Sequence, residues 1–216
     1  MLIIYDFISY TDVFTYNITT LESLLIYAMK TITYQSDYLG NGFEFATINQ
    51  PDDYEGKVVA TVIRKQCSMP SNKAVLYVHG FNDYFFQSDM AHRFNEKEYH
   101  FYAIDLRKYG RSTLPHHKSN NMRSLTEYFA DLDEALDIVR QEGNEQVLLS
   151  GHSTGGLLVT LYASERVGNE KFDTIFCNSP FYDMNMPGYQ KRLLVPLVAL
   201  FGKYFPYSKV RIVVSA

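Results

Sequence analysis

The sequence predicts an α/β fold with a mostly parallel central sheet and helices on both of its faces. Two observations lead to this prediction. Apolar runs of strand length alternate along the chain with segments of helical periodicity, which is the order of parallel β-α-β units. The apolar runs are also continuous, as in strands that are buried on both faces of a sheet. They cover residues 74–78, 101–104, 147–149 and 174–177.

An N-terminal antiparallel hairpin is expected ahead of these units. Residues 42–48 and 57–64 are strand-like, and the turn-forming sequence QPDD at residues 50–53 lies between them. Residues 1–28 differ from the rest of the chain because they contain no glycine and show no clear period. We interpret them as an uncertain N-terminal extension that precedes a core at residues 29–182.

Three segments between the apolar runs have the periodicity of helices, at residues 83–95, 124–141 and 154–166. In the second segment Ser124 and Glu127 have the spacing of a capping box, which favours a helix start there. Its apolar residues recur at spacings of three and four, so that one face can pack on the sheet. These residues are Leu125, Phe129, Leu132, Leu136 and Val139.

The composition excludes several functions. The 216 residues carry a net charge of −4 without a basic patch, so nucleic-acid binding is not expected. No run of 18 apolar residues predicts a membrane span. The two cysteines are far apart in the sequence, which is typical of a reducing compartment and predicts a cytoplasmic protein. No cofactor or metal is expected, because no phosphate-binding glycine motif or cluster of metal ligands is present.

The most informative motif is GHSTG at residues 151–155, a G-x-S-x-G pentapeptide between an apolar strand and a helical segment. A serine at such a sharp strand-to-helix turn has its hydroxyl exposed, and the flanking small residues let the backbone turn tightly. Ser153 is therefore the candidate nucleophile. His79 and Asp105 also follow apolar runs, which predicts that all three lie at the carboxyl edge of the sheet, where active sites of such folds form.

Four stretches together resemble the α/β-hydrolase superfamily, within it the branch of monoacylglycerol lipases, lysophospholipases and S33-type serine aminopeptidases. They are VHGF at 78–81, DLRKYGRS at 105–112, DL at 131–132 and GHSTGG at 151–156. The resemblance covers about residues 42–205. It implies an α/β-hydrolase fold with Ser153 as the nucleophile. It also implies an oxyanion hole made by the backbone N–H groups of Phe81 and Thr154.

In this family an acid and a histidine follow later strands, C-terminal to a helical cap. By the resemblance, residues 183–216 are the start of that cap and the chain is C-terminally truncated, with an incomplete cap and without the last strands. Asp183 is the candidate acid, because some members carry the acid at that place. The base is either absent or replaced by His116 or His117, which lie on the expected edge of the sheet.

The predicted function is hydrolysis of carboxylic esters, acylglycerol or lysophospholipid-like, through an acyl-enzyme on Ser153. A serine hydroxyl needs a base to become a good nucleophile, so this chain is expected to be inactive or weakly active. Two alternatives stay open, an aminopeptidase-type serine peptidase and a non-catalytic or vestigial binding protein. The expected partner is a small ester or lipid substrate, and the cap is expected to make transient contacts with lipid surfaces.

Overall fold

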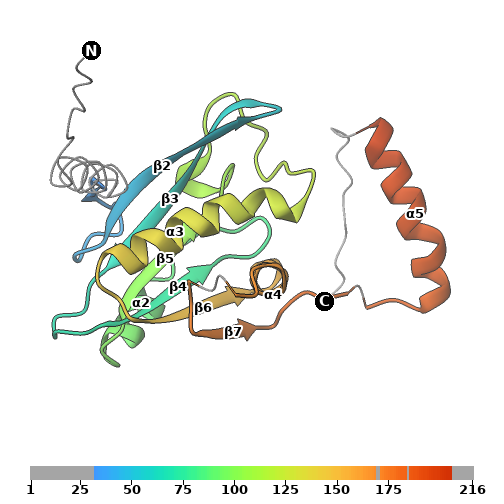
Figure 1. Cartoon of the computed structure of the whole chain (residues 1–216). Helices are drawn as coiled ribbons and strands as arrows, with labels where there is room; N and C mark the ends of the chain where they lie inside the picture. Colours follow the sequence, from blue (N-terminus) through green and yellow to red (C-terminus); the bar gives the residue numbers. More distant parts are fainter. Residues whose placement is uncertain (1–31, 169–170, 184, 206–216) are drawn as a thin grey trace, which may run out of the picture. The chain divides into compact units, whose positions relative to one another are not determined.

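The computed structural model describes residues 32–168, 171–183 and 185–205 (Figure 1). One compact unit ends at Pro180, and a second begins at Phe181. The predicted extension at residues 1–28 lies outside the described residues.

The first unit is built on a sheet of seven strands in the order β1-β2-β3-β5-β4-β6-β7. Strand β4 lies between β5 and β6 and is parallel to both, and β7 continues the parallel part next to β6. The strands are β1 (Gln35–Ser36), β2 (Glu44–Asp53), β3 (Gly56–Lys65), β4 (Lys73–Val78), β5 (His100–Asp105), β6 (Gln146–His152) and β7 (Thr174–Asn178).

The predicted α/β fold class is confirmed, with a parallel core and antiparallel strands at its N-terminal side. The pairs β1–β2, β2–β3 and β3–β5 are antiparallel, so the sheet is mixed rather than uniformly parallel. The hairpin is therefore part of the same sheet and does not form a separate one. Its second strand joins the parallel part directly, through the pairing of β3 with β5.

The hairpin turns later than the sequence predicts. Residues 50–53 belong to β2, although the register shifts between Gln50 and Asp53. Pro51 has no N–H to donate to the ladder, so it disturbs the pairing without ending the strand. The chain reverses at residues 54–55, where the Asp53 carboxylate accepts the N–H of Glu55 at 2.7 Å. Gly56 then takes a left-handed φ of 92°, a conformation that glycine adopts without strain.

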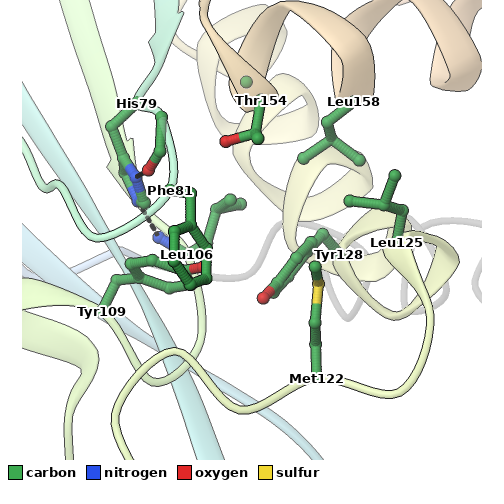
Figure 2. A pocket seen from close by; sticks show the side chains of 11 residues that line it. His79, Phe81, Leu106, Tyr109, Met122, Leu125, Tyr128, Thr154 and Leu158 are labelled. Atoms are coloured by element: carbon green, nitrogen blue, oxygen red, sulfur yellow. Dashed lines mark hydrogen bonds between the residues drawn. The ribbon is translucent and has the colours of Figure 1, made fainter. Parts of the chain in front are cut away.

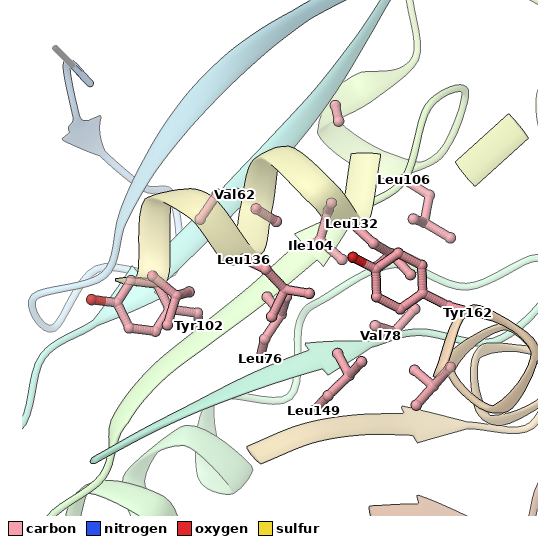
Figure 3. Packing of buried hydrophobic residues seen from close by; sticks show 14 of the residues in the cluster. Val62, Leu76, Val78, Tyr102, Ile104, Leu106, Leu132, Leu136, Leu149 and Tyr162 are labelled. Carbon is pink, nitrogen blue, oxygen red and sulfur yellow. The ribbon is translucent and has the colours of Figure 1, made fainter. Parts of the chain in front are cut away.

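Helices cover both faces of the sheet, as predicted. They are α2 (Ser88–Asn95), α3 (Phe129–Gln141) and α4 (Thr154–Glu165). On one face Leu76 and Ile104 pack with Leu132 and Leu136 of α3, in a cluster that also takes in α4 (Figure 3). On the other face Ala91 of α2 packs with side chains of β3, β4 and β5. The continuous apolar pattern of the central strands results from this double coverage.

The helix boundaries differ from the predicted ones for identifiable reasons. Helix α2 begins at Ser88 rather than at residue 83, because the Ser88 N–H donates to the Phe86 carbonyl at 2.9 Å instead of to the carbonyl four residues earlier. The predicted capping box at Ser124 and Glu127 is present. It starts a 3-10 turn, Leu125–Tyr128, which leads directly into α3.

The second unit contains helix α5 (Gly188–Tyr204). None of its side chains is buried, and its apolar residues are exposed around the helix, including Leu193, Val198 and Tyr204. In the described part of the chain, no helix has both the length and the apolarity needed to cross a bilayer.

Candidate active site

Ser153 alone connects strand β6 to helix α4. Its φ of 53° and ψ of −120° form a sharp turn that costs a non-glycine residue about 1–3 kcal/mol. Hydrogen bonds hold this conformation on both sides. The Ser153 N–H donates to the Asn178 carbonyl at 3.1 Å, and its carbonyl accepts the N–H groups of Gly156 and Leu157 at 3.0 and 3.2 Å. The strand, turn and helix therefore succeed one another in the order expected of a nucleophile elbow.

The glycines of the motif are required by close backbone contacts. A Cβ atom on Gly155 would lie 2.3 Å from the His79 carbonyl oxygen, and one on Gly151 would lie 2.5 Å from the Gly155 carbonyl oxygen. Gly80 is also tight, because a Cβ there would be 3.2 Å from the Cβ of Ser153. The first turn of α4 is thus pressed against the end of β4, which brings the loop after β4 beside the serine.

A cavity of about 20 Å³ lies at this junction (Figure 2). Phe81 and Thr154, the two predicted oxyanion donors, both line it. Thr154 is the first residue of α4, so its N–H has no acceptor within the helix and lies at the positive end of the helix dipole. The volume is enough for about one water molecule or one substrate oxygen.

Sequence reasoning did not identify the far wall of this cavity. It is formed by Met122, Leu125 and Tyr128 from the segment before α3, together with Leu106 and Tyr109 after β5 (Figure 2). The capping box at Ser124 predicted the helix start, but no sequence signal placed this segment opposite Thr154. The lining is mostly apolar and carries the buried hydroxyl of Tyr128.

His79 shapes the loop beside the serine and does not act as a base. The ring is 1% exposed, and its Nδ1–H donates to the Gly80 carbonyl at 2.8 Å. Its Nε2 accepts the Leu106 N–H at 3.2 Å, which requires that Nε2 carries no proton (Figure 2). The neutral ring therefore joins the loop after β4 to the loop after β5. Burial lowers the pKa of His79 below its ordinary 6.5, because the charged ring would lose its hydration.

This environment predicts a pH dependence of stability. Below pH 6.5 the unfolded chain takes up a proton on His79, whereas the folded chain resists it until its own lower pKa. The free energy of unfolding should therefore fall as the pH drops through this window, and His79 should contribute no pH dependence above it. Urea unfolding of the wild type and of His79→Gln between pH 5 and 7.5 measures the difference. Equal slopes for both proteins would contradict the assignment.

Several ion pairs hold the loop after β5, among them those of Asp105 and Asp131. Asp105 accepts hydrogen bonds from the Arg111 N–H and from the Arg111 side chain, each at 2.9 Å. Asp131 of α3 is fully buried and binds Arg107 through both carboxylate oxygens, with the closest contact at 2.6 Å. The Arg107 N–H also donates to Asp131 at 3.0 Å. These contacts fix the backbone on which Leu106 and Tyr109 reach the cavity.

The predicted acid and bases have other polar partners in the structure. The Nε2 atoms of His116 and His117 both contact the carbonyl of Lys57, at 3.0 and 2.8 Å. Asp183 belongs to the second unit, where it pairs with Lys191 of α5. Over residues 32–168, 171–183 and 185–205, no imidazole forms a hydrogen bond with the Ser153 hydroxyl. The roles of Asp183, His116 and His117 stay predictions.

Comparison with known proteins identifies the family of the chain. Residues 69–215 match the sequence model of the family described as "Serine aminopeptidase, S33". Epoxide hydrolase 4 of Mus musculus is 33% identical over 89 residues, which cover 41% of this chain and 23% of the relative. The chain thus spans about a quarter of the length of this curated relative.

Solved structures with a similar fold include an esterase and a lipase. A carboxyl esterase from Bacillus coagulans, in complex with glycerol, has a TM-score of 0.58 at 18% identity. This match covers 74% of the present chain and 51% of the esterase. A monoglyceride lipase from Saccharomyces cerevisiae, in complex with a substrate analogue, has a TM-score of 0.55 at 18% identity. This match covers 86% of the present chain and 57% of the lipase. At these identities the likeness shows the fold, of which the chain covers about half.

Proposed function

Because the chain belongs to the serine aminopeptidase S33 family of α/β-hydrolases, we propose that it hydrolyses carboxylic esters through an acyl-enzyme on Ser153. One observation carries the proposal. Ser153 sits in a left-handed turn at the N-terminus of α4, beside a cavity that Phe81 and Thr154 line. This is the place where an ester carbonyl can meet a hydroxyl and backbone N–H groups together.

The proposed reaction begins with attack of Ser153 Oγ on the ester carbonyl carbon. The hydroxyl proton passes to a base, and the carbonyl oxygen becomes an oxyanion that the N–H groups of Phe81 and Thr154 stabilise. One such donor contributes about 10²–10³ in rate, because it is already oriented before the charge forms. The alcohol then leaves with a proton, and water releases the acid from the acyl-enzyme. The step requires an imidazole near Oγ, the role for which His116 and His117 are the candidates and Asp183 the accompanying acid.

We propose an acylglycerol or lysophospholipid-like ester as the substrate. The side chains around the cavity are largely apolar, which suits the carbon atoms next to an ester carbonyl whose oxygen the cavity can hold. The solved relatives add support, since one was determined with glycerol and another with a substrate analogue of a monoglyceride lipase. The exposed apolar side chains of α5 suit transient contact with a lipid surface, where such substrates reside.

A non-catalytic binding protein is the second candidate. The observation that favours it is the lack of any imidazole hydrogen-bonded to the Ser153 hydroxyl within the described ranges. Without a base, the cavity and the N–H groups could still hold an acyl carbonyl, but the bond would be cleaved only at a residual rate.

A fluorophosphonate probe distinguishes the two candidates. We expect covalent labelling of the wild-type chain at Ser153, with a loss of at least about 100-fold in Ser153→Ala. Ser164→Ala is the matched control, because Ser164 is an exposed serine of the same helix α4, and it should keep full labelling. Hydrolysis of p-nitrophenyl acyl esters and of aminoacyl p-nitroanilides then separates esterase from peptidase activity. A cooperatively folded chain that is not labelled would contradict the acyl-enzyme and favour the binding protein.

A further inference from the structure

The turn after β4 carries the Phe81 N–H, so the contacts of this turn decide where that donor lies. Phe81 and Asn82 form the turn, and Asn82 has a left-handed φ of 53°. Asparagine tolerates this conformation better than most residues, but its surroundings still have to hold it. Further along the loop, the Phe85 N–H donates to the Asp105 carboxylate at 2.8 Å. The position of the Phe81 N–H therefore depends on what holds Asn82.

A side chain from a remote segment holds Asn82. Asn120 Nδ2 donates to Asn82 Oδ1 at 3.0 Å. Asn120 also has a left-handed φ, of 60°, and its backbone N–H donates to the Lys108 carbonyl at 3.0 Å. Asn120 thus joins the loop after β4 to the loop after β5, with its side chain on the first and its backbone on the second.

Lys108 is a firmly held acceptor for Asn120. Its side chain is fully buried, and its ammonium group pairs with Asp53 at 2.6 Å and with Glu55 at 3.2 Å. Both carboxylates belong to the tip of the β2–β3 hairpin, residues 53–55. The ring of Tyr54, from the same tip, has its centroid 4.1 Å from Lys108 Nζ. Two opposite charges and an aromatic ring thus surround the ammonium group, which fixes Lys108 against the hairpin.

The same hairpin tip holds the chain on both sides of Asn120. Glu55 accepts the side-chain amide of Asn121 at 2.6 Å and the backbone N–H of Lys118 at 3.2 Å. The Tyr54 hydroxyl donates to the Asn121 carbonyl at 3.1 Å. The side chain of Asn120 therefore extends from a backbone that is fixed before it and after it.

We propose that Asn120 is a positioning residue for the oxyanion donor Phe81, and that the hairpin tip is the fixed support from which it acts. The inference rests on the proposed acyl transfer at Ser153. Asn120 does not touch the substrate but acts through Asn82, which follows the donor directly. An oxyanion donor contributes only when it points to the place where the charge forms, and a displacement of about 1 Å can cost about 10²-fold in rate.

A positioning role and a merely structural role predict different results. The hydrogen bond between Asn82 and Asn120 lies at the protein surface. A bond of this kind contributes little to the free energy of unfolding, because water replaces it when it is broken. Loss of the Asn120 side chain should therefore slow the reaction of Ser153 without an equivalent loss of stability.

Asn120→Gly removes the side chain, and glycine adopts the left-handed φ without strain. We expect the rate of fluorophosphonate labelling at saturating probe to fall about tenfold, while the probe concentration that gives half the maximal rate changes less than about twofold. Ser119→Gly is the matched control, because it adds a glycine to the same exposed segment and leaves Asn120 in place. Equal labelling of the two variants would overturn the proposal, as would a loss of rate that only follows a loss of folded protein in urea unfolding.

Aspartate substitutions test the pair itself. Asn82→Asp keeps an acceptor for the Asn120 amide, and Asn120→Asp can accept from the Asn82 amide once that amide turns over. Each single variant should therefore be labelled within about threefold of the wild-type rate. The double variant Asn82→Asp/Asn120→Asp places two carboxylates opposite each other, and it should be labelled at least about tenfold more slowly than the two single effects combined. Additive effects in the double variant would refute the role of the pair.

A measurement without chemistry separates this inference from the proposed function. The ¹⁵N order parameters of the Phe81 and Asn82 amides report the turn directly. We expect them to fall from about 0.85 in the wild type to below about 0.6 in Asn120→Gly, with Ser119→Gly like the wild type. If the folded wild type is not labelled, the proposed function fails, and the order parameters decide whether Asn120 holds the turn. Equal order parameters in the wild type and Asn120→Gly would overturn the inference.

Discussion

Replacement of Gly155 by alanine is expected to abolish labelling of Ser153 and to destabilise the fold by about 3 kcal/mol or more. The added Cβ would lie 2.3 Å from the His79 carbonyl oxygen and 2.5 Å from that of Val78. Both are backbone atoms at the end of β4, and β4 is held by neighbours on both sides. Neither atom can give way without moving the sheet, so the first turn of α4 has to shift instead. Such a shift displaces Thr154 and the serine together.

The control for this substitution is Gly202→Ala in α5. Nothing lies within 4 Å of a Cβ at that position, and alanine is the better helix former by about 1 kcal/mol. Thermal or urea unfolding, recorded in parallel with fluorophosphonate labelling, measures both consequences. If Gly155→Ala retained wild-type stability and labelling, the close approach of α4 to β4 would be incorrect.

Replacement of Asp131 by asparagine is expected to destabilise the protein by about 3–5 kcal/mol. The Asp131 carboxylate is fully buried, and the Arg107 side chain against it is 8% exposed. Asparagine keeps the shape but removes the charge, which leaves the buried guanidinium without the carboxylate that it binds directly. Removal of one partner of a buried ion pair destabilises a protein by more than the intact pair stabilises it, because a buried charge is left without its partner.

Asp173→Asn is the matched control, because Asp173 pairs with Arg140 while its side chain is 51% exposed. A surface pair of this kind is worth about 0–1 kcal/mol. Urea unfolding of both variants gives the comparison. Asp131→Asn should also weaken probe labelling, since Arg107 holds the loop from which Leu106 and Tyr109 line the cavity. Equal destabilisation by the two substitutions would contradict the role of the buried pair.

Much of the fold could be predicted from local patterns. Continuous apolar runs identified the central strands, and the capping box at Ser124 marked the approach to α3. The turn of the hairpin was misplaced, because Pro51 and its acidic neighbours have turn propensity but sit in an extended strand. Propensity is a weak local preference, and the pairing of β2 with β3 outweighs it.

In the candidate site, too, some features follow from local sequence and others only from the packing of remote segments. The pentapeptide around Ser153 specified a strand, a turn and a helix within a few residues, so the sequence by itself determined the elbow. The neighbours of the elbow are remote in the chain. Tyr128 reaches the cavity across from Thr154, and His79 bonds Leu106, only because strands β4, β5 and β6 are adjacent in a particular order.

The sequence alone therefore determined the fold class, the central strands and the candidate nucleophile, since each depends on residues that are close in the chain. The tertiary structure alone decided the tautomer of His79 and the burial of Asp131 with Arg107. These contacts depend on strand order and register, which bring together residues from different elements. A periodic pattern records which face of an element is buried, but not which element packs against it.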